Sequence, residues 1–171
     1  MLLRRSASLV LGVLLTLPTF AVAETPPLGS SADFKPDPAT VTRHGAGWKY
    51  PQAGWIVLHI EGSPYERGYQ HGRLMSREIA DCVRTLAEAR SPKAPTEAWH
   101  LMRNAANALF LRRFDPELVE EMRGIADGAA SAEAKFDDRP IDIVDIVTIN
   151  CDIESEFLEP ALGATATGLE G

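Results

Sequence analysis

The sequence contains only two cysteines, Cys82 and Cys151, among its 171 residues. Two cysteines are too few for the disulfide framework of a small secreted domain. Cys82 falls on or beside the apolar face of an expected helix, so we expect buried free thiols, with pairing in an oxidising compartment as the alternative. The histidines at 59, 71 and 100 are isolated and have no neighbours at metal-ligand spacing. We therefore expect no metal and no cofactor.

Positive charge and long apolar runs are also scarce. Lys and Arg number 17 against 24 Asp and Glu, which gives a formal net charge of -7. This balance argues against binding to nucleic acid or to anionic membranes. The apolar stretch 9–20 is interrupted by Thr16, Pro18 and Thr19, and it is shorter than the roughly 20 residues that a membrane-spanning helix needs. We therefore expect no nucleic-acid partner and no membrane anchor.

The first residues resemble an export signal. Arg4 and Arg5 precede the apolar stretch, and Ala21 and Ala23 form a small-residue cleavage site. We expect residues 1–23 to be a signal peptide that is cleaved after Ala23, and the protein to be periplasmic or secreted. Residues 24–51 are rich in Pro, Gly and Ser, which predicts an extended N-terminal arm. Its end is expected to dock onto the domain through Trp48 and Tyr50.

The stretch 54–86 organises the rest of the chain. Its first residues, 55–60, have the β-branched and aromatic alternation of a strand. Ser63, Pro64 and Glu66 then provide an N-cap, a first helical residue and the acid of a capping box. Apolar or small residues follow at helical spacing, which predicts one amphipathic helix. They are Tyr65, Gly68, Gly72, Met75, Ile79, Val83 and Leu86.

Two glycines lie on the buried face of this helix, Gly68 and Gly72. Glycine inside a helix costs about 0.5–1 kcal/mol relative to alanine. Their position therefore predicts that another backbone comes very close. A tight contact between helix and strand is the expected cause, and a ligand passing over the glycines is the alternative.

Further helices follow at regular intervals. Thr96 caps the first of them, and Asp115 with Pro116 begins the next. In that helix Gly124 and Gly128 are again four residues apart, one position off the apolar face. The stretch 135–140 is expected to be a loop.

The last helix is expected to begin at Asp142, with Asp145 in its first turn and an apolar face that continues to Phe157. A strand over 141–149 is the alternative, because this segment is β-branched throughout. Residues 52–158 would then form one domain of a strand and helices, and residues 159–171 a flexible end.

Polar residues in the last expected helix, and arginines in and after the helix that begins at Thr96, are candidates for a network or a site. Asn150 and Glu154 lie one turn apart on a mainly apolar face, and buried polar groups need partners. We expect this pair to anchor a polar network, with a direct role in a site as the alternative. Arg103, Arg112 and Arg113 are expected to form a solvated face rather than an anion site.

Two motifs carry a resemblance to a known family. The first is EGSPYERGYQHG at residues 61–72, and the second spans residues 113–130. In this order they resemble the N-terminal region of the autoproteolytic acyltransferases and hydrolases typified by acyl-coenzyme A:6-aminopenicillanic acid acyltransferase. Phospholipase B-like proteins share the general pattern more distantly. The matching positions are Gly62, Pro64, Glu66, Gly68, Gly72, Glu121, Gly124, Ala126 and Gly128.

The resemblance implies an α+β fold. The chain would be the mainly helical N-terminal portion of the αββα fold of N-terminal-nucleophile (Ntn) hydrolases, with one strand followed by three or four helices. The resemblance also implies a Cys nucleophile that is freed by self-cleavage, with the new α-amine as general base. The reaction would be amide hydrolysis or acyl transfer on an N-acyl or peptide-like substrate outside the cytoplasm.

Cys151 is the only candidate for this nucleophile in the second half of the chain, and we disfavour it. It falls within an expected helix, and the 20 residues after it are too few for two sheets and a substrate pocket. The sequence therefore predicts the part upstream of the nucleophile, inactive alone and completed by a downstream nucleophile-containing segment or subunit. The alternative is a small secreted helical binding domain without catalysis.

Overall fold

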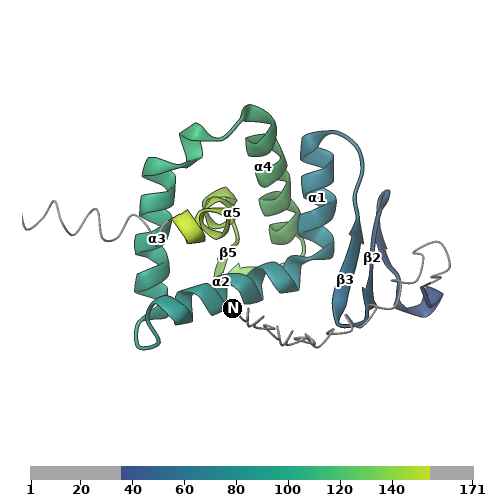
Figure 1. Ribbon diagram of the computed structural model, residues 1–171, viewed down its shortest axis with the longest axis horizontal. Helices are drawn as coiled ribbons and strands as arrows, with labels where there is room; N and C mark the ends of the chain where they lie inside the picture. Colours follow the sequence, from purple (N-terminus) through teal and green to yellow (C-terminus); the bar gives the residue numbers. More distant parts are fainter. Residues whose placement is uncertain (1–35, 155–171) are drawn as a thin grey trace, which may run out of the picture. The chain divides into compact units, whose positions relative to one another are not determined.

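The computed structural model describes residues 36–154, and an α+β fold is found there, as predicted (Figure 1). The strands β1 (Thr42–His44), β2 (Gly47–Gln52) and β3 (Trp55–His59) form an antiparallel sheet in that order. The helices are α1 (Pro64–Leu74), α2 (Ser76–Arg90), α3 (Pro95–Leu109), α4 (Pro116–Ser131) and α5 (Ile143–Asn150). The short elements are the 3-10 turns η2 (Pro38–Thr40) and η3 (Leu111–Arg113), and the strands β4 (Lys135–Phe136) and β5 (Arg139–Pro140).

The sheet has more strands than predicted. The strand at 55–59 is confirmed, but β2 pairs with it and β1 pairs with β2. Ala53 and Gly54 form the two-residue turn between β2 and β3 with φ values of 48° and 85°, the left-handed conformation that hairpin turns require. The ring of Trp48 stacks on that of His59 across the two strands, with 4.9 Å between their centroids.

The expected arm therefore overlaps the sheet. Its last residues form β1 and most of β2, and the expected domain boundary after residue 51 falls inside β2. The segment 42–52 contains Pro51 and few β-branched residues, so its own propensity did not indicate a strand. Pairing with a neighbour makes it one. Residues 1–35 and 155–171, which include the expected signal peptide and the expected flexible end, lie outside the described residues.

The long helix predicted from Pro64 to Leu86 is two helices. The first ends at Leu74, the second begins at Ser76, and Met75 at the junction has φ -109° and ψ 20°. No Gly or Pro marks this break. Instead α1 packs mainly on α4, whereas α2 turns away and packs mainly on α3 (Figure 1). Tertiary packing therefore decides where the helix ends.

Helix α5 lies in the middle of the helical part of the chain (Figure 1). It is apolar on most sides, which is typical of a buried helix, and Ile146, Val147 and Thr148 are buried. Asp142 caps it, because its carboxylate accepts the main-chain N–H of Val144 at 2.8 Å. The helix prediction is confirmed and the strand alternative is wrong. The helix ends at Asn150, and Phe157 lies outside the described residues.

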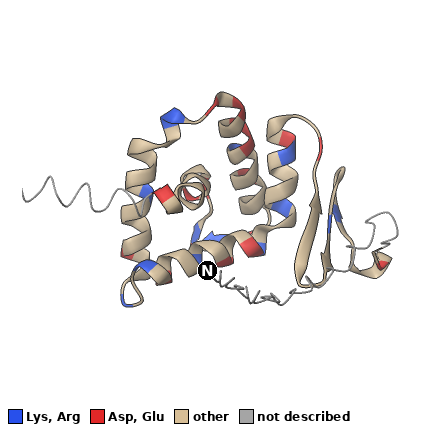
Figure 2. Cartoon of the chain, in the orientation of Figure 1, with Lys and Arg blue, Asp and Glu red and all other residues tan. Residues whose placement is uncertain are grey.

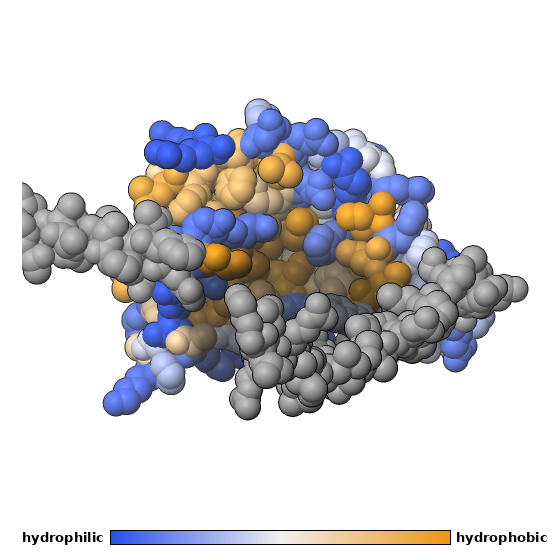
Figure 3. Space-filling view, viewed as in Figure 1, coloured by the Kyte–Doolittle hydropathy of each residue, from blue (hydrophilic) through white to orange (hydrophobic). Residues whose placement is uncertain are grey.

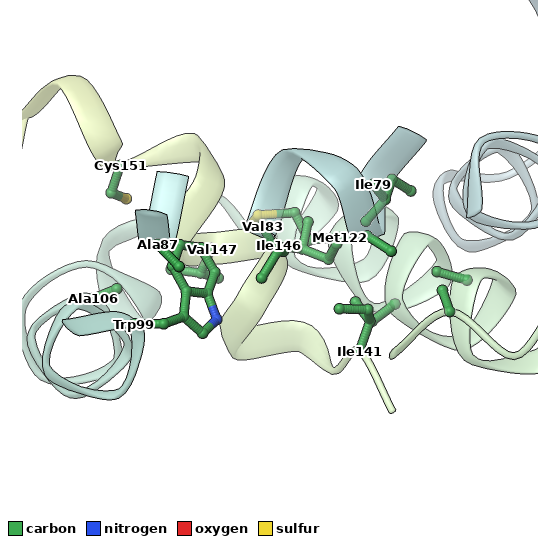
Figure 4. Close-up of a cluster of buried hydrophobic side chains, with 14 residues drawn as sticks. Ile79, Val83, Ala87, Trp99, Ala106, Met122, Ile141, Ile146, Val147 and Cys151 are labelled. Atoms are coloured by element: carbon green, nitrogen blue, oxygen red, sulfur yellow. The ribbon is translucent and has the colours of Figure 1, made fainter. Parts of the chain in front are cut away.

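The hydrophobic core surrounds α5 (Figure 4). Trp99 of α3 is fully buried there, with Val83 of α2 and Met122 of α4. The ring of Trp99 also meets Phe136 edge-on, with 6.2 Å between centroids. Phe136 belongs to β4, so the expected loop 135–140 is a hairpin that closes the core.

Hydrophobic and hydrophilic residues are separated on the face drawn in Figure 3. Hydrophobic residues gather over the middle of the helical part, and hydrophilic residues lie around them. Within residues 36–154 no helix has both the length and the apolar character needed to cross a bilayer.

Candidate functional site

The two glycine pairs meet in one contact between α1 and α4. Gly68 and Gly72 face the α4 backbone, and Gly124 and Gly128 face the α1 backbone. A Cβ atom on any of the four would overlap a carbonyl oxygen of the facing helix, so this approach requires glycine. The predicted close backbone contact is confirmed. Its partner is a helix, where a strand was expected.

The contacts ascend together along both helices, so α1 and α4 run parallel. Gly68 meets Glu121 and Gly72 meets Ile125, four residues further on in each helix. Parallel helices place like ends of their dipoles side by side, which is unfavourable. Ion pairs offset this, because Arg67 of α1 donates to Glu121 at 2.9 Å and to Glu117 at 3.2 Å. Figure 2 shows the acidic residues at the start of α4 beside basic residues of α1.

The loop before α1 is held by the first motif. The Oε2 atom of Glu66 accepts the N–H of Ser63 at 2.8 Å and its hydroxyl at 2.7 Å. Pro64 is the first residue of α1, and Gly62 before it has φ 114°, which favours glycine. The carbonyl of Gly62 accepts from Arg67 at 3.1 Å. Arg67 therefore joins the first motif to Glu121 of the second, which lies 54 residues away in sequence.

The structure thus brings the named motif positions of α1 and α4 together, and their contacts are structural. None of them presents a nucleophile. We call this unit the glycine junction, and it comprises Gly62, Pro64, Glu66, Gly68, Gly72, Glu121, Gly124 and Gly128. His71 lies on α1 beside Gly72. Burial lowers the pKa of His71, and the charge of Glu121 opposes this shift.

Cys151 follows the last residue of α5 and is 2% exposed. Burial raises the pKa of its thiol to about 11, and the charge of Glu154 acts in the same direction. At neutral pH roughly one such thiol in ten thousand is ionised, so Cys151 is a poor nucleophile. Burial, and then the charge of Asp152, also raises the pKa of Cys82. Cys82 is a free thiol, as expected, although it is only half-buried.

A buried polar cluster lies at the start of α5, and we call it the Asp145 cluster. Asp145 is fully buried, and its Oδ1 atom accepts from Trp99 Nε1 at 2.8 Å. Arg139 donates to both carboxylate oxygens of Asp145, each at 2.8 Å, and Arg103 also donates to Oδ1. Arg103 binds both oxygens of Asp142 as well, at 2.9 and 2.8 Å. Two guanidinium groups thus neutralise two carboxylates, which makes this burial tolerable.

The electrostatics of Asp142 follow from this arrangement. Burial raises its pKa, but the hydrogen bonds and charge of Arg103 act in the opposite direction. The N–H of Asp145 and the charge of Arg139 reinforce Arg103, so the pKa of Asp142 lies below its ordinary value. Asp142 is therefore ionised at neutral pH, and the cluster links α3, β5 and α5.

Sequence reasoning placed the polar network on the wrong residues. Asn150 and Glu154 are both exposed, and the Nδ2 atom of Asn150 donates to the carbonyl of Ile146 in its own helix at 2.8 Å. Arg103, which was expected on a solvated face, has a side chain that is only 14% exposed. The acid pair at 142 and 145, following Arg139 closely, was the available signal for the cluster.

A pocket of about 330 Å³ lies between the β1–β2 turn and α1, and we call it the aromatic pocket. Its lining residues are His44, Gly45, Tyr65, Glu66, Tyr69 and Gln70. The ring centroid of Tyr69 lies 5.7 Å from that of His44 and 6.3 Å from that of Tyr65. The sequence did not predict this pocket, because His44 and the tyrosines are 21 or more residues apart and only the sheet brings them together.

The polar groups around the aromatic pocket already have partners. The Tyr65 hydroxyl donates to Asp127 at 2.8 Å, and this hydrogen bond, together with burial and the Asp127 charge, raises the pKa of Tyr65. The amide of Gln70 binds the main chain of Glu61 at both ends, at 2.7 and 3.1 Å. Among residues 36–154 no group of three or more His, Cys, Asp or Glu residues could hold a metal ion.

Comparisons with known proteins give little further information. No protein-family model matches the sequence, and no solved structure matches it. An uncharacterized protein from Archaeoglobus fulgidus is 33% identical over 97 residues, which cover 50% of this chain and 15% of the archaeal protein. The similarity is therefore to a small part of a much longer protein.

Proposed function

We propose that this chain is the pre-nucleophile part of an exported amide-bond hydrolase or acyltransferase of the autoproteolytic Ntn type. One observation carries the proposal: the two motifs of the resemblance, far apart in sequence, pack as one glycine junction in which Arg67 bonds to both. An accidental match to either motif would not require the other motif to lie against it.

In this proposal the described residues form the helical and first-strand portion of an αββα fold. The nucleophilic Cys comes from a segment outside the described residues, on the same polypeptide or on a partner subunit. The buried thiol of Cys151 is not this nucleophile. The substrate is an N-acyl or peptide-like amide, and no cofactor takes part. The match to a small part of a longer archaeal protein is compatible with a region that occurs within larger chains.

The test is an activity assay of this chain alone and of the chain co-expressed with a nucleophile-bearing segment encoded beside it. The substrates are N-acyl amino acids and acyl amides. Each assay is run with the wild-type chain and with the Cys151→Ala variant. We expect no turnover by the chain alone, turnover after co-expression, and no effect of Cys151→Ala. Turnover by the 171-residue chain alone that Cys151→Ala abolishes would contradict the proposal.

Export is the second part of the proposal. It rests on Arg4, Arg5, the apolar stretch after them and the small residues Ala21 and Ala23, all of which lie outside the described residues. Mass spectrometry of the exported protein should find Glu24 as the first residue. Exported material that retains Met1 would contradict cleavage.

A second candidate function is a small secreted binding domain. The observation that favours it is the aromatic pocket, which residues of the sheet and of α1 form without any further segment. Failure of co-expression to produce amide turnover, together with binding of a ligand in the pocket by the chain alone, would favour this alternative.

A further inference from the structure

The aromatic pocket offers ring faces to a ligand. The ring of Tyr69 is near those of both His44 and Tyr65, and it is tilted against them by 40° and 31°. Tyr65 is 36% exposed, so part of this residue is accessible from solvent. Rings that converge on a concave surface are the usual arrangement for binding a cation over π-faces.

The carboxylate that lines the pocket carries negative charge. Glu66 lines it, and Asp127 and Glu120 both add negative potential at Tyr65. No Lys or Arg is among the residues that line the pocket. Of the nearby basic residues, Arg67 is bound to acids of α4 and Arg73 donates to the carbonyl of Ser131. The local field therefore attracts a cation.

The aromatic lining, rather than the hydrogen-bonding groups, distinguishes between kinds of cation. The Oε2 atom of Glu66 binds Ser63, Oδ2 of Asp127 binds Tyr65, and the Gln70 amide binds the main chain. Each of these carboxylates also has a second oxygen that can accept, so hydrogen bonding does not separate a primary amine from other cations. An alkylated ammonium ion needs no hydrogen bonds, and its apolar surface suits the rings.

We propose that the aromatic pocket binds a small alkylated ammonium cation. The pocket volume of about 330 Å³ is at the lower end of the range of ligand sites, which limits the ligand to a small ion or head group. This binding is independent of the amide chemistry proposed above, so either proposal can fail without the other.

Choline chloride is the probe, titrated into the full chain while the tyrosine and histidine ring signals are followed by NMR. Sodium chloride at the same concentration controls for ionic strength. We expect saturable shifts at millimolar choline. The neutral carbon isostere of choline, 3,3-dimethyl-1-butanol (dimethylbutanol), should bind at least about five-fold more weakly, because it lacks the positive charge that the rings attract.

Three variants locate the site. Tyr65→Leu keeps an apolar group but removes the ring, and should weaken choline binding about five-fold, whereas Tyr65→Phe should change it less than about two-fold. Trp55→Leu is the matched control, because Trp55 is an aromatic residue that is 79% exposed and lies outside the pocket. Circular dichroism checks that each variant is folded.

Three results would overturn the proposal. One is the absence of saturable shifts in the millimolar range. Another is equal binding of dimethylbutanol, which would make the pocket an apolar subsite. The third is an equal loss of affinity in Trp55→Leu, which would place the binding elsewhere on the surface.

Discussion

Single atoms decide how closely α1 and α4 approach. At Gly68, Gly72, Gly124 and Gly128 the missing Cβ lets one helix backbone contact the other. Such an approach allows Cα–H groups to contact carbonyl oxygens. Each of these contacts is weak, but they repeat along the two helices. The sequence predicted the close contact from the cost of glycine in a helix. It could not identify the partner, because Gly124 and Gly128 fell one position off the apolar pattern.

Gly72→Ala is the sharpest test at this scale. Helix propensity alone would make alanine more stable by about 0.5–1 kcal/mol. At this position, however, a Cβ would overlap the carbonyl oxygen of Ile125, so we expect a loss of about 1–3 kcal/mol in the free energy of unfolding. Chemical denaturation measures it.

The control for this variant is Arg77→Ala, two residues beyond the break, where the side chain is 89% exposed. Its effect should stay within about 0.5 kcal/mol. An increase in stability on Gly72→Ala would mean that the helices are further apart than the structure places them.

At the scale of elements, local signals predicted where helices begin better than where they end. Pro64, Pro116 and Asp142 mark the starts of α1, α4 and α5 as predicted. The break at Met75 has no local signal, because it depends on which neighbours α1 and α2 pack against. The Asp145 cluster has the same origin, since its arginines come from α3 and β5.

Asp145→Asn tests whether the cluster holds these elements together. The change removes one buried charge and leaves Arg103 and Arg139 with too few acceptors. Removal of one partner from a buried ion pair costs about 3–5 kcal/mol, and we expect a loss of that order in unfolding free energy. Asp81→Asn is the matched control, because Asp81 also binds an arginine, Arg84 at 2.6 Å, but is half-exposed.

The control should lose less than about 1 kcal/mol, as surface ion pairs do. Equal losses in the two variants, measured by thermal or urea unfolding, would show that burial of the cluster contributes nothing. Retention of wild-type stability by Asp145→Asn would contradict the cluster's structural role.

For the whole molecule, the α+β class and the order of strand before helices were predictable from periodicity and caps. The three-stranded sheet was not, because β1 and β2 become strands only by pairing.

The extra strands change which edges of the sheet are open to association. The sequence alone suggested a single strand with two open edges, whereas β2 covers one edge of β3. Within the described residues, β3 therefore has one open edge, on the side away from β2.

This remaining edge is poorly protected. β3 contains no Lys, Arg or Pro, and Trp55 and Ile56 on it are 79% and 41% exposed. The opposite edge, β1, is only three residues long and carries Arg43. Short and charged edges resist pairing with other chains, whereas apolar ones promote it. We therefore expect the chain alone to self-associate through β3 and to bind a hydrophobic dye.

Ile56→Lys should reduce both behaviours, because a charge at the edge disfavours pairing with another strand. Leu101→Lys is the matched control, since Leu101 is 71% exposed but lies on α3. It should lower dye binding at most slightly and leave association unchanged, as measured by sedimentation. A wild-type chain that stays monomeric and binds no dye, or equal effects of the two variants, would contradict association through this edge. In the proposed enzyme, addition of the nucleophile-bearing segment should suppress self-association as Ile56→Lys does, because a strand from that segment would occupy the same edge.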